Sequence, residues 1–175
     1  MNDVLVFRVE EHEKHKKILL SLIDSLISDY DKSFLTDTKG SKVCSDWNLP
    51  KEVDRSYLQH FYSIIGSTMD KVAESIGLES YDWTIENAWF HQYSKSESYP
   101  WHNHPKCHFT NCYYLELPDD SYKTEIKGKD GKLIEFDAKE GDVMTCPAWM
   151  LHRSKPNGRE RKTVISFNSN YWNKN

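Results

Sequence analysis

The sequence predicts a mainly β domain with N-terminal helices, in which two helices buttress a small barrel or sandwich of short strands. Two observations predict this architecture. Apolar residues recur at helical spacing in the first half of the chain, and the second half consists of strand-forming segments separated by turn residues. These segments follow one another too closely for the helical connections of a parallel sheet. The length suits one domain with its own core, so we expect residues 1–175 to form a single domain.

The first half contains two stretches with the apolar repeat of an amphipathic helix, over residues 10–30 and from Pro50 to Gly77. Acidic residues stand early in the first stretch, where the helix dipole favours them. Pro50 suits a first helical turn and Gly77 suits a helix end. The apolar stripes are Ile18, Leu19, Leu22, Ile23, Leu26 and Ile27, then Val53, Tyr57, Leu58, Phe61, Ile64, Ile65, Met69, Val72 and Ile76. We expect a loop over residues 31–49 and a helical support over about residues 10–77.

The second half is rich in β-branched and aromatic residues, beginning with the segment from Trp83 to Phe90. Turn residues separate the segments that follow, among them Gly131 and Gly141. Strands are expected over residues 83–90, 108–117, 122–127, 132–136, 142–145 and 162–168. Together these segments predict a β-barrel over about residues 81–170.

Charge and cysteine content narrow the class of protein. A net charge of -4 gives no overall basic field, so nucleic acid is not an expected partner. No apolar run approaches the roughly 20 residues of a membrane-spanning helix, and the N-terminus lacks the positive segment of a secretory signal. The four cysteines form no Cys-x-x-Cys pair and are expected to be reduced thiols. These features predict a cytoplasmic protein with no membrane partner.

Histidines provide the strongest chemical signal in the sequence. His102 and His104 are two residues apart, so in an extended segment both side chains project from the same face. His152 follows a strand-like segment and a Pro-led turn, which can bring a third imidazole from another strand. Three imidazoles predict a metal site for Zn, Cu, Fe or Ni. A single histidine is more often a surface or core residue, which is how we interpret His12 and His60 in the helical half.

A second signal follows His152. On a strand, Arg161 and Thr163 share a face, and an inward arginine needs an anionic partner. A guanidinium with a nearby hydroxyl can grip a carboxylate, so the pair predicts a small dicarboxylate between Arg161 and the metal. The alternative is that Arg161 forms a salt bridge with an acidic side chain.

Four segments carry a resemblance to a known family: residues 101–105 (Trp-His-Asn-His-Pro), 111–115, 141–152 and 159–168. In this order they resemble the 2-oxoglutarate/Fe(II) oxygenases, particularly the small oxygenases of this type encoded by phages of marine bacteria. The resemblance covers about residues 84–170 and implies a double-stranded β-helix (jelly-roll) barrel. It also implies Fe(II) as cofactor, 2-oxoglutarate as co-substrate and, for a phage-encoded chain, a location in the bacterial host cytoplasm.

The resemblance also implies roles for single residues. His102 would be the first iron ligand and His152 the distal one. Arg161 would bind the far carboxylate of 2-oxoglutarate, assisted by Thr163 or by one of the tyrosines Tyr113, Tyr114 and, more weakly, Tyr93. The substrate mouth would be lined by aromatic residues that could equally pack in the core, namely Trp89, Phe90, Trp101 and Trp149. The implied reaction is hydroxylation of a small-molecule or peptidyl substrate.

His104 departs from the family pattern, because this position is expected to hold a carboxylate. Three interpretations stay open. In the first, the site is a three-histidine iron centre. In the second, two histidines join a carboxylate from elsewhere, with Glu97 and Asp142 as weak candidates. In the third, the chain binds metal without oxygenase activity.

Two other classes of protein fit parts of the pattern. A cupin-like metal-dependent enzyme that does not use 2-oxoglutarate accounts for the spacing of Gly141, Pro147 and His152, although it leaves Arg161 without a role. A non-enzymatic jelly-roll binding module would make the histidine cluster a coincidence. Dependence on metal and on 2-oxoglutarate separates the three classes.

Overall fold

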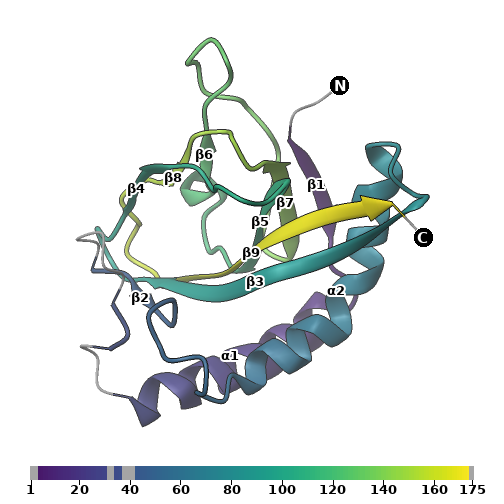
Figure 1. The fold of residues 1–175 in the computed structure, drawn as a ribbon. Coiled ribbons are helices and arrows are strands. Elements are labelled where there is room, and N and C mark those ends of the chain that lie inside the picture. Colours follow the sequence, from purple (N-terminus) through teal and green to yellow (C-terminus); the bar gives the residue numbers. More distant parts are fainter. Residues whose placement is uncertain (1–3, 31–33, 37–41, 174–175) are drawn as a thin grey trace.

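The computed structural model describes residues 4–30, 34–36 and 42–173, which form two facing β-sheets with two helices against the larger sheet (Figure 1). The larger sheet has six strands in the order β1-β7-β5-β9-β3-β2, and the smaller has three in the order β4-β8-β6. The strands are β1 (Leu5–Arg8), β2 (Cys44–Ser45), β3 (Tyr81–Tyr93), β4 (Tyr99–His102), β5 (Phe109–Glu116), β6 (Glu125–Ile126), β7 (Asp142–Pro147), β8 (His152–Ser154) and β9 (Lys162–Asn173). The predicted mainly β architecture with two buttressing helices is confirmed.

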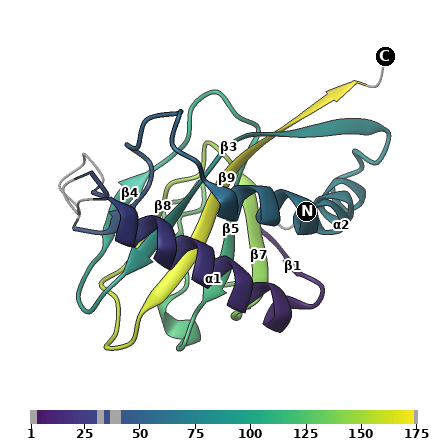
Figure 2. The same ribbon diagram turned by 90° about the horizontal axis from the view of Figure 1, so that it is seen from below.

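The helices α1 (His12–Asp29) and α2 (Ser56–Ser75) lie across the outer face of the larger sheet (Figure 2). Their buried apolar residues pack on side chains of that sheet, as Phe61 does on Phe167 with ring centroids 5.1 Å apart. The second helix begins at Ser56 and not at the predicted Pro50, and it ends before Gly77, whose φ of 71° is the left-handed conformation that glycine tolerates. Among the described residues, no helix has the length and apolar character to cross a membrane.

The strand β9 shows how the two faces of the larger sheet differ. Ile165 and Phe167 belong to the core between sheet and helices, whereas Lys162, Val164 and Ser166 line a cavity between the two sheets. Because side chains alternate along a strand, the apolar residues assign one face to the helices and leave the other for the interior of the barrel. The barrel interior therefore receives the more polar face of this strand.

The shortest strands were not predicted from the sequence. β1, β2, β4 and β8 are short, and a run of two to four residues carries little periodicity. The expected strand over residues 132–136 is wrong, because its only ladder contact is an isolated bridge between Lys127 and Leu133. Of the expected strand over residues 122–127, Glu125–Ile126 form β6, and Lys127 takes part in the isolated bridge.

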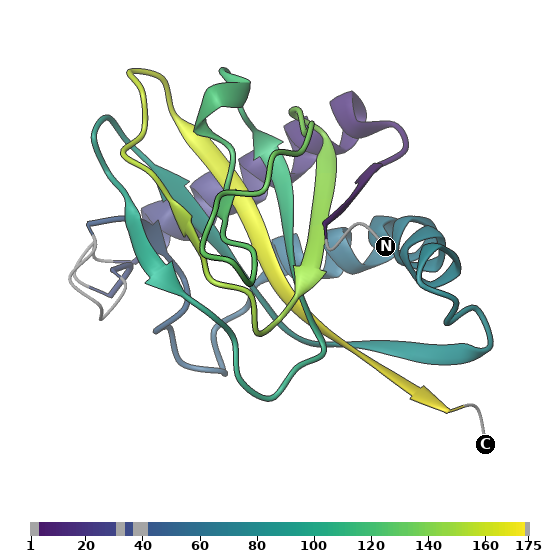
Figure 3. The same ribbon diagram turned by 90° about the horizontal axis from the view of Figure 1, so that it is seen from above.

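The smaller sheet covers the inner face of the larger one, with the helices on the far side (Figure 3). β4 and β8 pair antiparallel, and His102 lies directly opposite His152 in this register. The interior between the sheets contains a second apolar cluster that includes Tyr99, Tyr114 and Val164. This arrangement positions the residues of the smaller sheet around a single interior space.

Candidate metal centre

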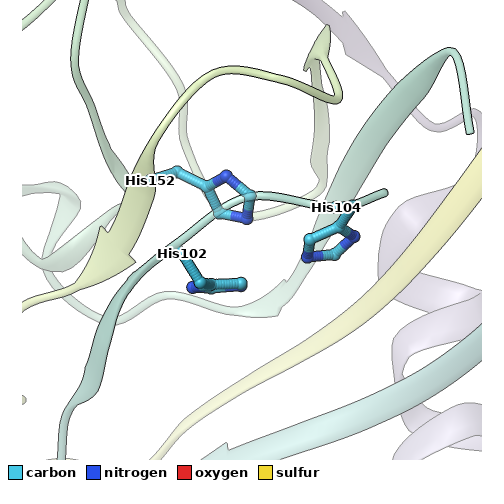
Figure 4. A group of neighbouring side chains, drawn as sticks. All are labelled: His102, His104 and His152. Carbon is cyan, nitrogen blue, oxygen red and sulfur yellow. The ribbon is translucent and has the colours of Figure 1, made fainter. Parts of the chain in front are cut away.

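The structure brings together the three histidines that the sequence singled out. His102 ends β4, His104 lies just after it and His152 begins β8, and their rings face one another (Figure 4). One ring nitrogen of each lies within 4.8 Å of one ring nitrogen of the others. The main-chain N–H of His104 donates to the carbonyl of Ala148 at 2.9 Å, which fixes the segment after β4 to the turn before β8. The site is therefore built from paired strands and a tied turn.

The Nδ1 atoms of all three imidazoles point away from the centre of the group and bond to oxygen acceptors. His102 Nδ1 lies 2.9 Å from the Pro100 carbonyl oxygen, and His152 Nδ1 lies 3.0 Å from the Met150 carbonyl oxygen. His104 Nδ1 lies 2.5 Å from Oδ1 of Asn168. Since an oxygen lone pair can only accept, each Nδ1 carries the proton and each Nε2 keeps the lone pair. This is the tautomer in which Nε2 binds a metal ion.

Burial keeps His152 in the neutral form that a ligand needs. Desolvation lowers the pKa of His152 to about 4, against the opposing effect of the Met150 carbonyl, and the nearby His104 lowers it further. A metal ion therefore does not have to displace a proton from His152 at neutral pH.

The described part of the chain provides no carboxylate to this group, which consists of His102, His104 and His152. Glu97 accepts a hydrogen bond from the main-chain N–H of Ser94 at 2.7 Å. Asp142, at the start of β7 in the larger sheet, accepts one from the main-chain N–H of Lys139. The structure therefore brings neither of the two weak candidates to the histidines.

Two adjoining cavities meet at the histidines. The inner cavity lies between the sheets and is lined by the three histidines together with Tyr93, Cys112, Thr124, Ser154 and Lys162. The outer cavity, of about 230 Å³, is lined by Trp47, Asn87, Asn103, Pro105 and Asn168. Both are lined by His102 and His104, and also by Trp89, His91 and Tyr99. A metal ion between the histidines would be accessible from both cavities.

Lys162 is a charged residue of the inner cavity that the sequence analysis missed. It is only 2% exposed, and its Nζ donates to the Tyr122 carbonyl at 3.0 Å and to Ser154 Oγ. Burial lowers the pKa of Lys162 to about 8. Among the described residues, no carboxylate lies within 4.0 Å of Nζ. A buried ammonium group without a counter-charge favours an anionic ligand in the cavity.

Arg161 does not point into the cavity, so the prediction of an inward guanidinium is wrong. Arg161 pairs with Glu116 at 2.8 Å and with Asp24 of α1 at 3.1 Å, on the helix side of the sheet. Thr163 donates to Glu116 at 2.6 Å on the same side. The predicted phase of the strand is therefore wrong, and the alternative, a salt bridge between Arg161 and an acidic side chain, is the arrangement found.

Two other predicted cofactor residues, Tyr113 and Tyr114, also lie away from the two cavities. Tyr113 faces the helices, where its hydroxyl lies 2.7 Å from His12 Nδ1, because it shares the phase of the helix-facing residues of β5. Tyr114 is buried inside the barrel, and its hydroxyl accepts a hydrogen bond from the main-chain N–H of Thr124. Neither tyrosine lines the inner or the outer cavity, whereas Tyr93 lines the inner one.

Of the predicted aromatic residues, Trp89 lies on both cavities, with its ring centroid 5.7 Å from that of His104. Trp101 points away from the cavities and lies beside Lys127 and Arg153, because on a strand it faces opposite to its neighbour His102. Trp149 is 48% exposed on the turn before β8. Phe90 packs in the core beneath the helices.

A second group of ligand-type side chains, His12, Glu13 and Glu140, lies on the helix side. Glu140 already binds the ammonium group of Lys16 and accepts a hydrogen bond from the main-chain N–H of Leu117. This network is an ion-pair cluster that connects α1 to the sheet.

Comparison with known proteins supports the fold. No protein-family model matches the chain, and no curated protein matches it by sequence. A prolyl hydroxylase from Trichoplax adhaerens, solved with a hypoxia-inducible-factor peptide, superimposes with a TM-score of 0.69 at 13% identity, over 99% of this chain and 84% of that one. A viral collagen prolyl hydroxylase from Paramecium bursaria Chlorella virus-1, solved with 2-oxoglutarate, superimposes with a TM-score of 0.56 at 17% identity, over 96% of each chain. A 2-oxoglutarate/Fe(II) oxygenase family protein from Burkholderia pseudomallei superimposes with a TM-score of 0.59 at 12% identity, over 94% of this chain and 93% of that one. The chain therefore has the double-stranded β-helix fold of these structures.

Proposed function

We propose, from a fold shared with 2-oxoglutarate/Fe(II) oxygenases, that the protein is a 2-oxoglutarate-dependent Fe(II) dioxygenase that hydroxylates an uncharged group of its substrate. One observation carries the proposal. Three imidazoles that present Nε2 lone pairs to one point share a cavity with a buried lysine to which the described residues offer no counter-charge. A metal ion and a small dicarboxylate satisfy both features at once.

The metal ion would be held by His102, His104 and His152, a donor set that suits Fe(II). When bound, iron supplies the chemistry that couples oxidative decarboxylation of 2-oxoglutarate to hydroxylation of a C–H bond. The protein holds the three imidazoles in one tautomer and surrounds them with buried side chains, among them Trp89 and Tyr99. Such an enclosure excludes bulk water from the metal.

We assign the far carboxylate of 2-oxoglutarate to Lys162, in place of the Arg161 expected from the sequence. The Lys162 ammonium group lies over the ring of Tyr93, with Nζ 4.1 Å from the centroid, and beside Ser154. These groups provide a charge and neutral donors in one corner of the inner cavity. The near end of the same molecule would then be directed at the histidines that line the same cavity.

The substrate would enter through the outer cavity. Its lining contains aromatic rings and amides, with the Trp47 and Trp89 centroids 4.5 Å apart, and the described residues contribute no Asp, Glu, Lys or Arg to it. Desolvating a charged group there would be costly, which is why we propose that the group that reacts is uncharged. A neutral side chain of a peptide and a neutral small molecule both meet this condition.

An anaerobic titration tests the metal and co-substrate sites together. Adding Fe(II) and then 2-oxoglutarate is expected to produce the weak visible charge-transfer band of a chelated 2-oxo acid. His152→Ala removes a ligand and is expected to abolish the band and to weaken Fe(II) binding by more than about tenfold. Iron binding with no response to 2-oxoglutarate would favour the cupin-like class. Failure to bind either one would favour a non-enzymatic binding module.

The affinity for 2-oxoglutarate is expected to fall as pH rises above about 8. The pKa of Lys162 in the folded protein is about 8, so the ammonium group that pairs with the carboxylate is lost above that value, while 2-oxoglutarate keeps its charge. The loss should approach about tenfold per pH unit. Titrations between pH 7 and 10, with Co(II) affinity measured alongside, check this. An affinity that stays constant over this range would contradict the assignment of Lys162.

A further inference from the structure

We infer that Asn168, oriented by Asn87, is the positioning residue that makes His104 a metal ligand. The inference rests on the proposed metal site and explains how an imidazole can serve where the resemblance expects a carboxylate. A carboxylate has equivalent oxygens and needs no tautomer, whereas an imidazole binds metal only through a nitrogen that carries no proton. His104 therefore needs a partner that holds the proton on Nδ1.

Asn168 provides that partner from the opposite sheet. It lies on β9, is 7% exposed, and its Oδ1 lies 2.5 Å from His104 Nδ1. Asn87 lies directly opposite Asn168 in the pairing of β3 with β9, next to an irregularity in the register. The Asn168 side chain donates from Nδ2 to Oδ1 of Asn87 at 2.7 Å. The two amides and the imidazole thus form one chain of hydrogen bonds.

The direction of this chain decides which nitrogen of His104 can bind metal. Because Nδ2 of Asn168 is directed at the Asn87 oxygen, the amide oxygen of Asn168 faces the imidazole. An oxygen there requires a proton on Nδ1 and leaves the lone pair on Nε2. The opposite amide orientation would place a donor against Nδ1 and move the proton to Nε2. Asn87 therefore acts on the metal through two hydrogen bonds.

His104 differs in this respect from the other two histidines. His102 and His152 donate to main-chain carbonyls two residues earlier in their own segments, at Pro100 and Met150. Those acceptors are fixed by the local backbone and do not depend on a side chain. The Nδ1 of His104 bonds instead to a side chain of the larger sheet, so the tautomer of His104 can be changed by substitution at Asn168.

The experiment measures Co(II) binding to the purified full chain, by competition with a chromophoric chelator and by the Co(II) visible spectrum. Asn168→Ala is expected to weaken binding by about 10- to 100-fold, the usual effect of removing a partner that orients a ligand, and to shift the spectrum toward that of His104→Ala. Asn168→Asp keeps an acceptor for Nδ1 and is expected to retain both the Co(II) affinity and the Co(II) spectrum of the wild type. Asn170→Ala is the matched control, since Asn170 is a buried amide of the same strand that bonds to His108 and Glu86.

The outcomes separate the inference from the proposed function. Wild-type protein that binds no Co(II) overturns the metal site and the inference with it. Wild-type binding that is lost in His104→Ala but unchanged in affinity and spectrum in Asn168→Ala overturns the inference alone. If Asn168→Ala does not fold, the exposed Asn87 decides: Asn87→Ala should weaken Co(II) binding several-fold, and unchanged binding overturns the inference.

Discussion

Lys162→Met is expected to remove 2-oxoglutarate binding while leaving metal binding intact. Methionine fills much of the space of the lysine stem but has no charge, so a carboxylate would enter a buried cavity without a cationic partner. Removing one member of a buried charge pair costs roughly 2–5 kcal/mol, which corresponds to an affinity at least about 30-fold weaker. Isothermal titration of the Co(II)-loaded protein with 2-oxoglutarate measures this loss.

Arg161→Met provides the matched control at the next position of the chain. Arg161 has 40% of its side chain exposed and pairs with Asp24 and Glu116 on the helix side, so its removal is expected to leave the 2-oxoglutarate affinity within about twofold. The reverse result, with Arg161→Met losing the co-substrate and Lys162→Met retaining it, would restore the role that the sequence indicated for Arg161.

The same lysine substitution should raise stability. The pKa of Lys162 is lowered by burial from its ordinary 10.5 to about 8, so the unfolded chain binds more protons between these values and the stability of the wild type rises with pH across them. Lys162→Met removes the titrating group and with it this pH dependence of stability. Its gain in Tm is therefore expected to be greatest below pH 8 and to shrink toward pH 10.5. A Tm difference that does not vary with pH would indicate that Lys162 is not a buried cation.

Asp46→Ala is expected to destabilise the fold more than any surface substitution. Asp46 is 1% exposed and accepts hydrogen bonds from Arg55 Nε at 3.0 Å, the Tyr57 hydroxyl at 2.7 Å and the main-chain N–H of Phe90 at 2.9 Å. It thereby ties the segment before α2 to both α2 and β3. Breaking a buried pair in this way costs roughly 3–5 kcal/mol, so a fall in Tm of roughly 10 °C is expected by thermal unfolding.

Asp54→Ala is the control for this substitution, because Asp54 is exposed in the same segment and its loss is expected to change stability by less than about 0.5 kcal/mol. Asp46 also precedes Trp47, which forms a wall of the outer cavity. If the free energy of unfolding of Asp46→Ala lies within about 1 kcal/mol of the wild-type value, the three hydrogen bonds do not hold this segment in place.

The helices and the histidine cluster were accessible from the sequence, because their signals are local. Apolar residues such as Ile23 and Phe61 recur at the helical period and are the ones that the structure buries. The pair His102 and His104 lies within one extended segment, and His152 follows a recognisable turn. The tautomer of His104 was not accessible, since its acceptor Asn168 comes from a strand on the other sheet.

The lysine that we propose for 2-oxoglutarate lies one position after the arginine expected from the sequence, and the reason is physical. Arg161 and Lys162 are both cations, and a shift of one residue moves a side chain to the other face of a strand. The phase is set by what packs on each face. Ile165 and Phe167 are large and apolar, which assigns their face to the helices and gives Lys162 to the interior. Weighing that alternation would have identified the lysine.

The sheet order also determines when this chain can fold during its synthesis. Both edges of the larger sheet are formed by early segments, β1 and β2, whereas β9, which joins β5 to β3 in the middle of the sheet, is the last strand to be made. On the ribosome the helices would therefore emerge long before the surface that buries them. A separate fragment of residues 81–173 would present two unpaired strand edges, which promote aggregation. The barrel is thus expected to assemble only after β9 has left the ribosome.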